Sequence, residues 1–178
     1  MSNLILPTLI LLLTFSPLAA AEPQKGPVIA AYGPTVLVQD LDVPLKDGFE
    51  YRAVFDLADY RGENTSLNAD LVSVARYLNM HARNGVPLEN MTIAAVLHGA
   101  ALKNALSHQA YTSRYGSDNP NLDLLMQLHQ AGVAFYACGQ SMGFSGISKG
   151  ELASPVKVAL SAMTMMTVLK SEGYALIP

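Results

Sequence analysis

Short apolar runs alternate with amphipathic segments along most of this chain, and this alternation is the feature that most restricts its fold. The clearest run, residues 133–137, is rich in β-branched and aromatic side chains and lies between Gly132 and Gly139, as is typical of a buried strand. Strands that alternate with helices form parallel sheets with crossover helices on both faces. The sequence therefore predicts an α/β fold of three layers, α/β/α, with strands at residues 49–57, 91–97, 133–137 and 174–177.

The amphipathic segments between these runs predict the helices. Helices are expected at residues 67–84, 100–106, 121–131 and 156–172. Ser66 or Asn68 can cap the first of them. The last is expected to be the longest. It is expected to begin at Pro155, a residue favoured in the first helical position, and to end at Gly173, a residue favoured just after a helix. Residues 107–120 are polar and predict a long exposed loop or a partly helical flap.

The N-terminus predicts a leader and an arm ahead of this domain. Residues 4–13 are almost continuously apolar and are followed by Ala19-Ala20-Ala21, which is typical of a cleavable export signal. The first three residues carry no Lys or Arg, so an uncleaved membrane anchor is the alternative. The expected organisation is a signal peptide at residues 1–21, an extended arm at 22–48 with an edge strand at 35–39, and one domain at 49–178. We therefore expect a periplasmic or secreted protein.

Composition and motif spacing exclude several classes of function. The formal net charge is −3 and the basic residues form no stripe, which disfavours nucleic-acid binding. The four histidines lack the spacing of metal ligands, and the chain has no second cysteine to assist them. Dinucleotide, phosphate-loop and G-x-S-x-G motifs are also missing. No metal and no cofactor are expected.

Cys138 is the only cysteine, and it falls at the carboxyl end of the predicted strand at 133–137. Ligands of open α/β sheets bind at that edge. A single cysteine in an exported chain cannot form an internal disulfide, which suggests a reactive thiol or an intermolecular pair. The alternative is that Cys138 is a small buried apolar residue, as most free cysteines are.

Neighbouring residues complete a candidate site around this cysteine. His98 ends the strand at 91–97, so its imidazole reaches the same crevice and lowers the thiol pKa if the two strands are neighbours. The alternative is a buried imidazole bonded to backbone. The residues that follow the two strand ends supply backbone N–H groups. The candidate site therefore contains Cys138 and His98 as catalytic residues and Gly99, Gly139, Gln140 and Ser141 as ligand-binding residues.

These features resemble the DsrE/DsrF-like sulfur-relay family, in its exported single-domain members. The similarity rests on the strand that ends in Cys138, on Gly146-Ile147 downstream, on His98-Gly99, and on the expected Pro155 helix that ends in Gly173-Tyr174. The resemblance implies a flavodoxin-like architecture with a mainly parallel sheet of five strands. It also implies homo-oligomers, commonly trimers or hexamers, and persulfide chemistry on the cysteine that corresponds to Cys138.

Two functions follow, from different classes. The first is a sulfur carrier or sulfurtransferase that takes sulfane sulfur on Cys138 and passes it to a thiol of a donor or acceptor partner. The second is an oligomeric module that binds a small ligand and uses Cys138 only structurally.

The helix expected at 156–172 places Met163 and Met166 on one face and Met165 elsewhere. Part of this surface, or of residues 100–110, is therefore expected to be buried between subunits.

Overall fold

Five parallel strands form a single sheet in the computed structural model, which describes residues 21–178. The strands are β1 (Tyr51–Leu57), β2 (Met91–Leu97), β3 (Ala134–Cys138), β4 (Val156–Ala159) and β5 (Ala175–Ile177). Their order across the sheet is β4-β3-β2-β1-β5, and every neighbouring pair is parallel. The predicted α/β class and the five-stranded parallel sheet are confirmed. The expected leader lies outside the described residues except for Ala21.

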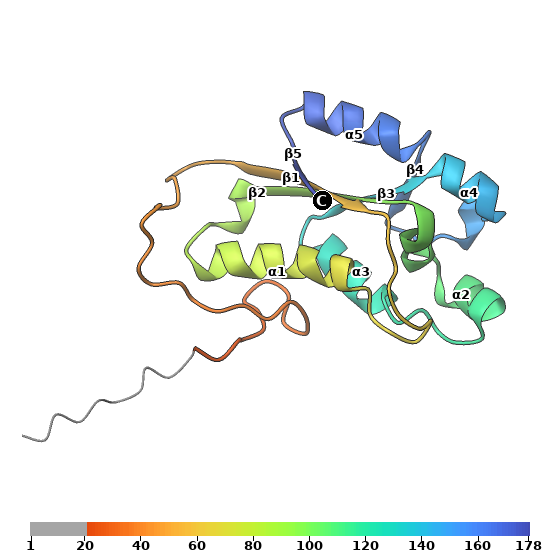
Figure 1. The fold of residues 1–178 in the computed structure, drawn as a ribbon, viewed down its shortest axis with the longest axis horizontal. Helices are drawn as coiled ribbons and strands as arrows, with labels where there is room; N and C mark the ends of the chain where they lie inside the picture. The colour runs from red at the N-terminus through yellow and green to blue at the C-terminus, as the bar shows by residue number, and fades with distance from the viewer. Residues whose placement is uncertain (1–20) are drawn as a thin grey trace, which may run out of the picture.

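Helices cover both faces of this sheet (Figure 1). The α-helices are α1 (Ala69–Arg83), α2 (His108–Tyr115), α3 (Leu122–Gln130), α4 (Gly139–Ser145) and α5 (Ala162–Ser171). Three short 3-10 helices are η1 (Leu88–Asn90), η2 (Gly99–Ala105) and η3 (Lys149–Glu151). Asn68 caps α1, as predicted, because its side chain accepts a hydrogen bond from the N–H of Asp70. The polar segment 107–120 is partly helical and contains α2.

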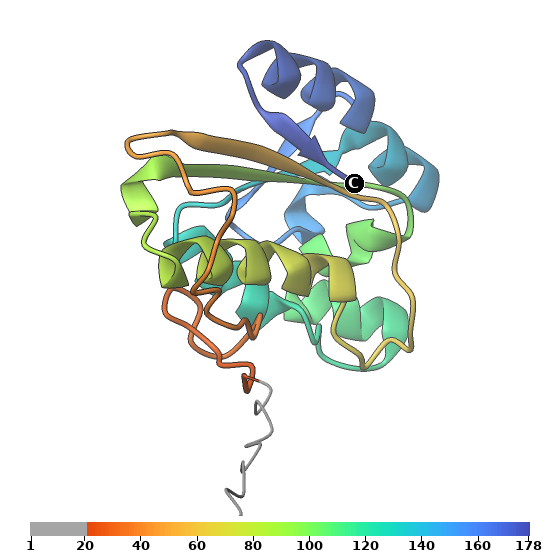
Figure 2. The same cartoon turned by 60° about the vertical axis from the view of Figure 1, so that its left-hand side comes forward.

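The handedness of the crossovers divides the helices unequally between the two faces. The chain advances from β1 through β2 and β3 to β4 in one direction, with α1 and α3 on one side of the sheet, which we call the α1 face. It then returns from β4 at one edge to β5 at the other through α5. Right-handed crossovers require this return to cross the opposite side, which we call the α5 face. Figures 1 and 2 show α5 on that side, opposite α1 and α3.

The hydrophobic core is also divided unequally between the two faces of the sheet. Side chains of β1 alternate between the faces, so that Phe55 and Leu57 join a large cluster with α1, α3 and η2. Val54 joins a much smaller cluster that contains Ala94, Val96, Cys138, Ala162 and Leu169. Most of the buried apolar surface that stabilises the fold therefore lies on the α1 face.

The helix predicted at residues 156–172 was wrong in its first third. Residues Val156–Ala159 form β4, which pairs with β3 at the edge of the sheet. Alternation in Val156-Lys157-Val158 is a strand pattern, and Pro155 lies in the turn before it rather than in a helix. Ser161 then caps α5 by accepting a hydrogen bond from the N–H of Thr164, so the helix has only ten residues.

The predicted grouping of Met163 with Met166, apart from Met165, was also wrong, because α5 packs on the sheet through the side that contains Ala162, Met165, Met166 and Leu169. Met165 and Met166 are partly buried against the small cluster on the α5 face. Met163 points away from the sheet and is 78% exposed. Residues 100–110 contribute Ala101, Leu102, Ala105, Leu106 and Ala110 to the core, so little of that segment is left for a subunit interface.

The N-terminal arm is ordered on α1 rather than extended, and the edge strand predicted at residues 35–39 is not formed. Only an isolated antiparallel bridge, between Gln24 and Thr35, is present there. Figure 2 shows the arm folded along the outer side of α1. Many of its backbone groups are paired by two side chains of that helix, Asn79 and Arg83, which lie one turn apart.

Asn79 is completely buried and holds the middle of the arm. Its Oδ1 accepts hydrogen bonds from the N–H groups of Val28 and Ile29 at 3.0 and 2.8 Å. Its Nδ2 donates to the carbonyls of Ile29, Tyr32 and Gly33 at 2.9–3.1 Å. One side chain thus pairs five backbone groups that would otherwise be buried without partners.

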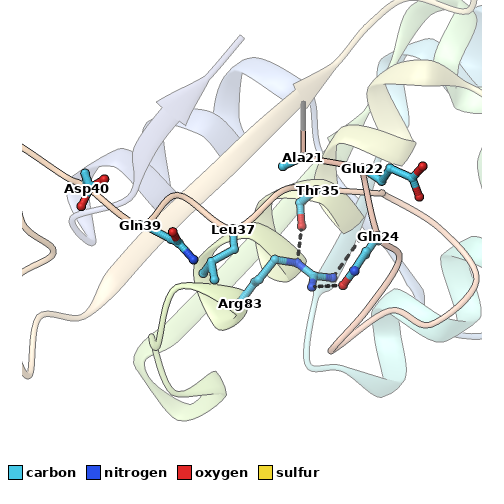
Figure 3. A pocket seen from close by; sticks show the side chains of 8 residues that line it. All are labelled: Ala21, Glu22, Gln24, Thr35, Leu37, Gln39, Asp40 and Arg83. Carbon is cyan, nitrogen blue, oxygen red and sulfur yellow. Dashed lines mark hydrogen bonds between the residues drawn. The ribbon is translucent and has the colours of Figure 1, made fainter. Parts of the chain in front are cut away.

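Arg83 joins the start of the arm to Thr35. Its guanidinium donates to Thr35 Oγ1, to Gln24 Oε1 and to the carbonyls of Gln24, Lys25 and Gly26. Figure 3 shows it on the wall of a cavity of about 720 Å³ between the arm and the end of α1. Because its donors are already engaged by the arm, this cavity is part of the arm's attachment and is a weak candidate for ligand binding.

Replacing Asn79 with Ala should destabilise the fold. The substitution leaves buried backbone groups unpaired, which costs about 1–3 kcal/mol for such a group. Urea unfolding followed by circular dichroism measures the change, and limited proteolysis reports release of the arm. Arg76→Ala, on the exposed side of the same helix, is the matched control and should change stability little. Equal stability of the two variants would show that the arm is not held by Asn79.

Candidate functional site

Cys138 lies where two neighbouring strands send the chain to opposite faces of the sheet. After β3 the chain enters α4, whose Met142 joins the core of the α1 face. After β4 it turns the other way and enters α5 on the opposite face. A change of direction between adjacent parallel strands opens a crevice at their carboxyl ends, where ligands of α/β proteins bind. The thiol of Cys138 lies at this point, on the α5 face, and the residue is 5% exposed.

The starts of α4 and α5 meet at this thiol. Cys138 is the N-cap of α4, and its Sγ accepts a hydrogen bond from the N–H of Ser141 at 3.4 Å. Burial raises the pKa of the thiol, but the hydroxyl and N–H of Ser141 and the N–H groups of Ala162 and Gln140 favour the thiolate. Together they outweigh burial, so the pKa of Cys138 is below its ordinary value. Such a thiol is a better nucleophile at neutral pH than a free cysteine.

Gly139 is required by close packing rather than by exposure of its own N–H. A Cβ at this position would lie 2.8 Å from the carbonyl oxygen of Ala159 and 3.2 Å from that of Leu160. Both contacts are shorter than ordinary van der Waals distances. The missing side chain therefore lets the end of β4 approach the start of α4, which brings the two helix starts to the same sulfur.

His98 lies beside this site, because β2 and β3 are neighbours and their register pairs Leu97 with Ala137. The backbone of His98 continues the extended strand, which places its ring on the same face as Cys138. Its Nε2 lies 2.7 Å from Oδ1 of Asp56 on β1. Within residues 21–178 the ring is thus bonded to Asp56 and not to the thiol. Carboxylates paired with histidine in this way fix the ring's orientation and tautomer.

Ser141 links the two strand ends. Its Oγ accepts a hydrogen bond from the N–H of Gly99 at 3.3 Å, while its own N–H donates to Cys138. Gly99 has a φ of +51°, and a Cβ there would lie 2.9 Å from the carbonyl of Ala58. Gln140, two residues after Cys138 in the first turn of α4, is exposed. The structure thus brings together all six residues selected from the sequence: Cys138, His98, Gly99, Gly139, Gln140 and Ser141.

Two participants were missed by sequence reasoning. Asp56 interrupts the apolar run of β1 near its carboxyl end, and that single acid was the available signal. Ala162 acts through its backbone N–H, so its side chain gave no signal at all.

Among residues 21–178, side chains of His, Cys, Asp and Glu form no group of three that could hold a metal ion. Over the same range no helix is long and apolar enough to cross a membrane.

The fold and the site define a class of protein: a parallel α/β domain with a single activated cysteine at the edge where the chain changes face. The sequence model of the DsrE/DsrF-like family matches residues 52–178, and the chain belongs to this family. A solved structure with the same fold is that of MTH1491, a protein of unknown function from Methanobacterium thermoautotrophicum. It is 21% identical, has a TM-score of 0.54, and the match covers 71% of this chain and 97% of that one. No curated protein sequence matches the chain.

Replacing Ser141 with Ala should raise the pKa of Cys138. The hydroxyl of Ser141 stabilises the thiolate, so its loss favours the protonated thiol while the backbone N–H groups remain. The midpoint of the iodoacetamide alkylation rate against pH should therefore move to higher pH. Ser145→Ala, an exposed serine of the same helix, is the control and should leave the midpoint unchanged. An unchanged midpoint in both variants would contradict this role.

Proposed function

We propose that this protein carries sulfane sulfur as a persulfide on Cys138. The observation that supports it most is the convergence of N–H groups from the starts of α4 and α5 on one sulfur atom. These donors stabilise a negative charge at the sulfur in a crevice from which most water is excluded. The family is a second support, since its name refers to sulfur-relay proteins.

The proposed reaction needs no outside oxidant or reductant. The Cys138 thiolate attacks the outer sulfur of a persulfide R–S–SH, a Cys–S–SH bond forms, and R–S⁻ leaves with the electron pair of the broken S–S bond. An acceptor thiolate then attacks the outer sulfur of Cys138–S–SH and expels the Cys138 thiolate. Each step conserves the oxidation level of the sulfane sulfur. The N–H groups of Ser141, Gln140 and Ala162 favour the thiolate at the start and end of the cycle.

His98 is proposed to assist proton transfer at this crevice. Asp56 holds its Nε2 at 2.7 Å, which leaves Nδ1 as the nitrogen available for exchange with solvent or substrate. Because the His98 ring is not bonded to the thiol, its loss should slow sulfur transfer but should not prevent it. Asp56 acts through His98 and is a positioning residue in this scheme.

Treatment of the protein with polysulfide should add sulfur at Cys138 alone, seen as the mass of one sulfur atom in intact-protein and peptide mass spectra. Cys138→Ser should abolish the addition while it preserves the fold, because the two side chains differ little in volume. His98→Ala should slow loading several-fold, and Asp56→Asn should slow it less. His129→Ala, an exposed histidine on α3, is the matched control. The alternative, a ligand-binding module with a structural cysteine, predicts slow alkylation of native protein and no added sulfur.

We also propose that the protein forms a homo-oligomer through the α5 side of the domain. Three large apolar side chains near the crevice are strongly exposed: Phe144 (91%), Leu160 (71%) and Met163 (78%). Leu160 lies in the turn after β4 and Met163 on α5, both on the thinly covered side of the sheet, and Phe144 lies on α4 after the neighbouring strand β3. Apolar groups gathered in this way are typical of surfaces that a partner covers.

Light scattering after gel filtration should show more than one protomer for the unaltered protein. A Leu160→Glu, Met163→Glu double variant should shift it to the monomer, because two buried charges without partners oppose association. Val43→Glu is the matched control, since Val43 is an equally exposed apolar residue of the arm. A clean monomer of the unaltered protein at high concentration would refute the proposal.

Export is proposed from the sequence alone, with cleavage after Ala21. The mature chain would then begin at Glu22, immediately before the segment that Arg83 holds. N-terminal sequencing of protein from the exported fraction should give Glu-Pro-Gln as its first residues. A chain that still begins at Met1 would instead favour a retained membrane anchor.

A further inference from the structure

A cavity of about 300 Å³ opens at the same edge of the sheet as the thiol but on the other side of Gly99 and Ser141. It lies between η2, the end of α2 and the end of α4. The residues that matter for its chemistry are Gly99, Leu102, Lys103, Arg114, Tyr115 and Ser145. Its size suits a small molecule rather than a macromolecular segment.

Lys103 provides a fixed positive charge at this cavity. Its Nζ donates to Asn64 Oδ1 at 2.8 Å and lies 3.5 Å from the centre of the Tyr60 ring and 5.5 Å from that of Tyr115. Tyr115 packs in turn on the buried Tyr111, whose hydroxyl donates to the carbonyl of Asn64 at 2.8 Å. The ammonium is therefore held by a scaffold of aromatic rings and one amide.

This charge has no anionic partner in the part of the chain that the structure describes. Among residues 21–178, no carboxylate lies within 4.0 Å of the Lys103 ammonium. Burial lowers the pKa of Lys103, as expected of a cation that is partly removed from water without a compensating anion. An anion bound in the cavity would relieve this cost.

The second cation of the cavity, Arg114, is already neutralised. Its Nε lies 2.7 Å from Oε1 of Glu151, and it donates to the carbonyls of Ser145 and Gly146 at 3.3 and 2.6 Å. The Arg114 guanidinium and the Ser148 backbone lower the pKa of Glu151 to about 2, so this pair stays ionised at neutral pH. Arg114 therefore lines the cavity without adding net positive charge to it. The uncompensated positive charge of the cavity is that of Lys103.

We propose that this cavity binds a small oxyanion, which Lys103 holds by charge and the Tyr115 ring contacts on one side. The proposal does not depend on persulfide chemistry, because neither Cys138 nor His98 lines the cavity. A carboxylate and a sulfur oxyanion share the required chemistry. They differ in shape, planar against tetrahedral, and this difference separates them in the experiment.

The test is an NMR titration of ¹⁵N-labelled protein with sodium sulfate and, separately, with sodium acetate, at constant ionic strength maintained with chloride. Saturable shifts confined to the amides of Gly99, Ala100 and Ser145 are expected for at least one anion. Sulfate alone would indicate a tetrahedral oxyanion, and acetate alone would indicate a carboxylate. Lys103→Met should weaken binding at least tenfold. Lys170→Met makes the same charge change on exposed α5 and should not alter it.

A second measurement keeps the proposal testable if Lys103→Met fails to fold. In the unaltered protein, the saturating anion should protect Lys103 from acylation, as measured by peptide mass spectrometry, while Lys170 remains fully reactive. Shifts that do not saturate, shifts that are equal in the two lysine variants, or acylation of Lys103 that the anion does not slow would each overturn the proposal.

Discussion

Parallel strands joined by right-handed crossovers can advance in only one direction while their helices remain on one face of a sheet. Here the chain uses that direction from β1 to β4, and the return to β5 must cross the opposite face. The same requirement makes the chain leave β3 and β4 toward opposite sides, which opens the crevice at Cys138. The position of the thiol, the convergence of two helix starts on it and the unequal core all follow from this one constraint.

The constraint also leaves one helix to cover a wide surface. A helix of ten residues is about 15 Å long, whereas five strands span about 19 Å. On the α1 face, α1, α3 and η2 bury a continuous core, whereas on the other side the described residues form only a small cluster under α5. The small residues Ala94 and Ala162 let α5 lie close to the sheet, but its outer side and the turn before it remain apolar and exposed. The α1 face thus contains most of the core that stabilises the fold, and the α5 face contains the surface proposed for assembly.

The fold was largely predictable because strand and helix patterns are local. The strand at residues 91–97 was predicted to the residue, and the strand predicted at 133–137 lies within one residue of β3 at each end. Val156–Ala159 was mistaken for helix, since a four-residue edge strand is too short to dominate the helical pattern that follows it. The six candidate site residues could be grouped from the strand ends alone. Asp56 and Ala162 could not, because their roles depend on register across the sheet and on a backbone N–H. The ordered arm depends on Asn79, a buried polar residue that sequence patterns do not distinguish from a surface one.

The attachment of the arm sets the orientation of the molecule relative to anything joined to its N-terminus. Arg83 ends α1, which runs back from the carboxyl end of β1 to the opposite edge of the sheet, and Gln24 is bound there. Cys138 lies at the far edge, at the end of β3. An affinity tag, a solid support or a lipid surface linked ahead of Ala21 would therefore meet the edge away from the thiol. Such a link would leave the strand end at Cys138 on the opposite edge of the sheet.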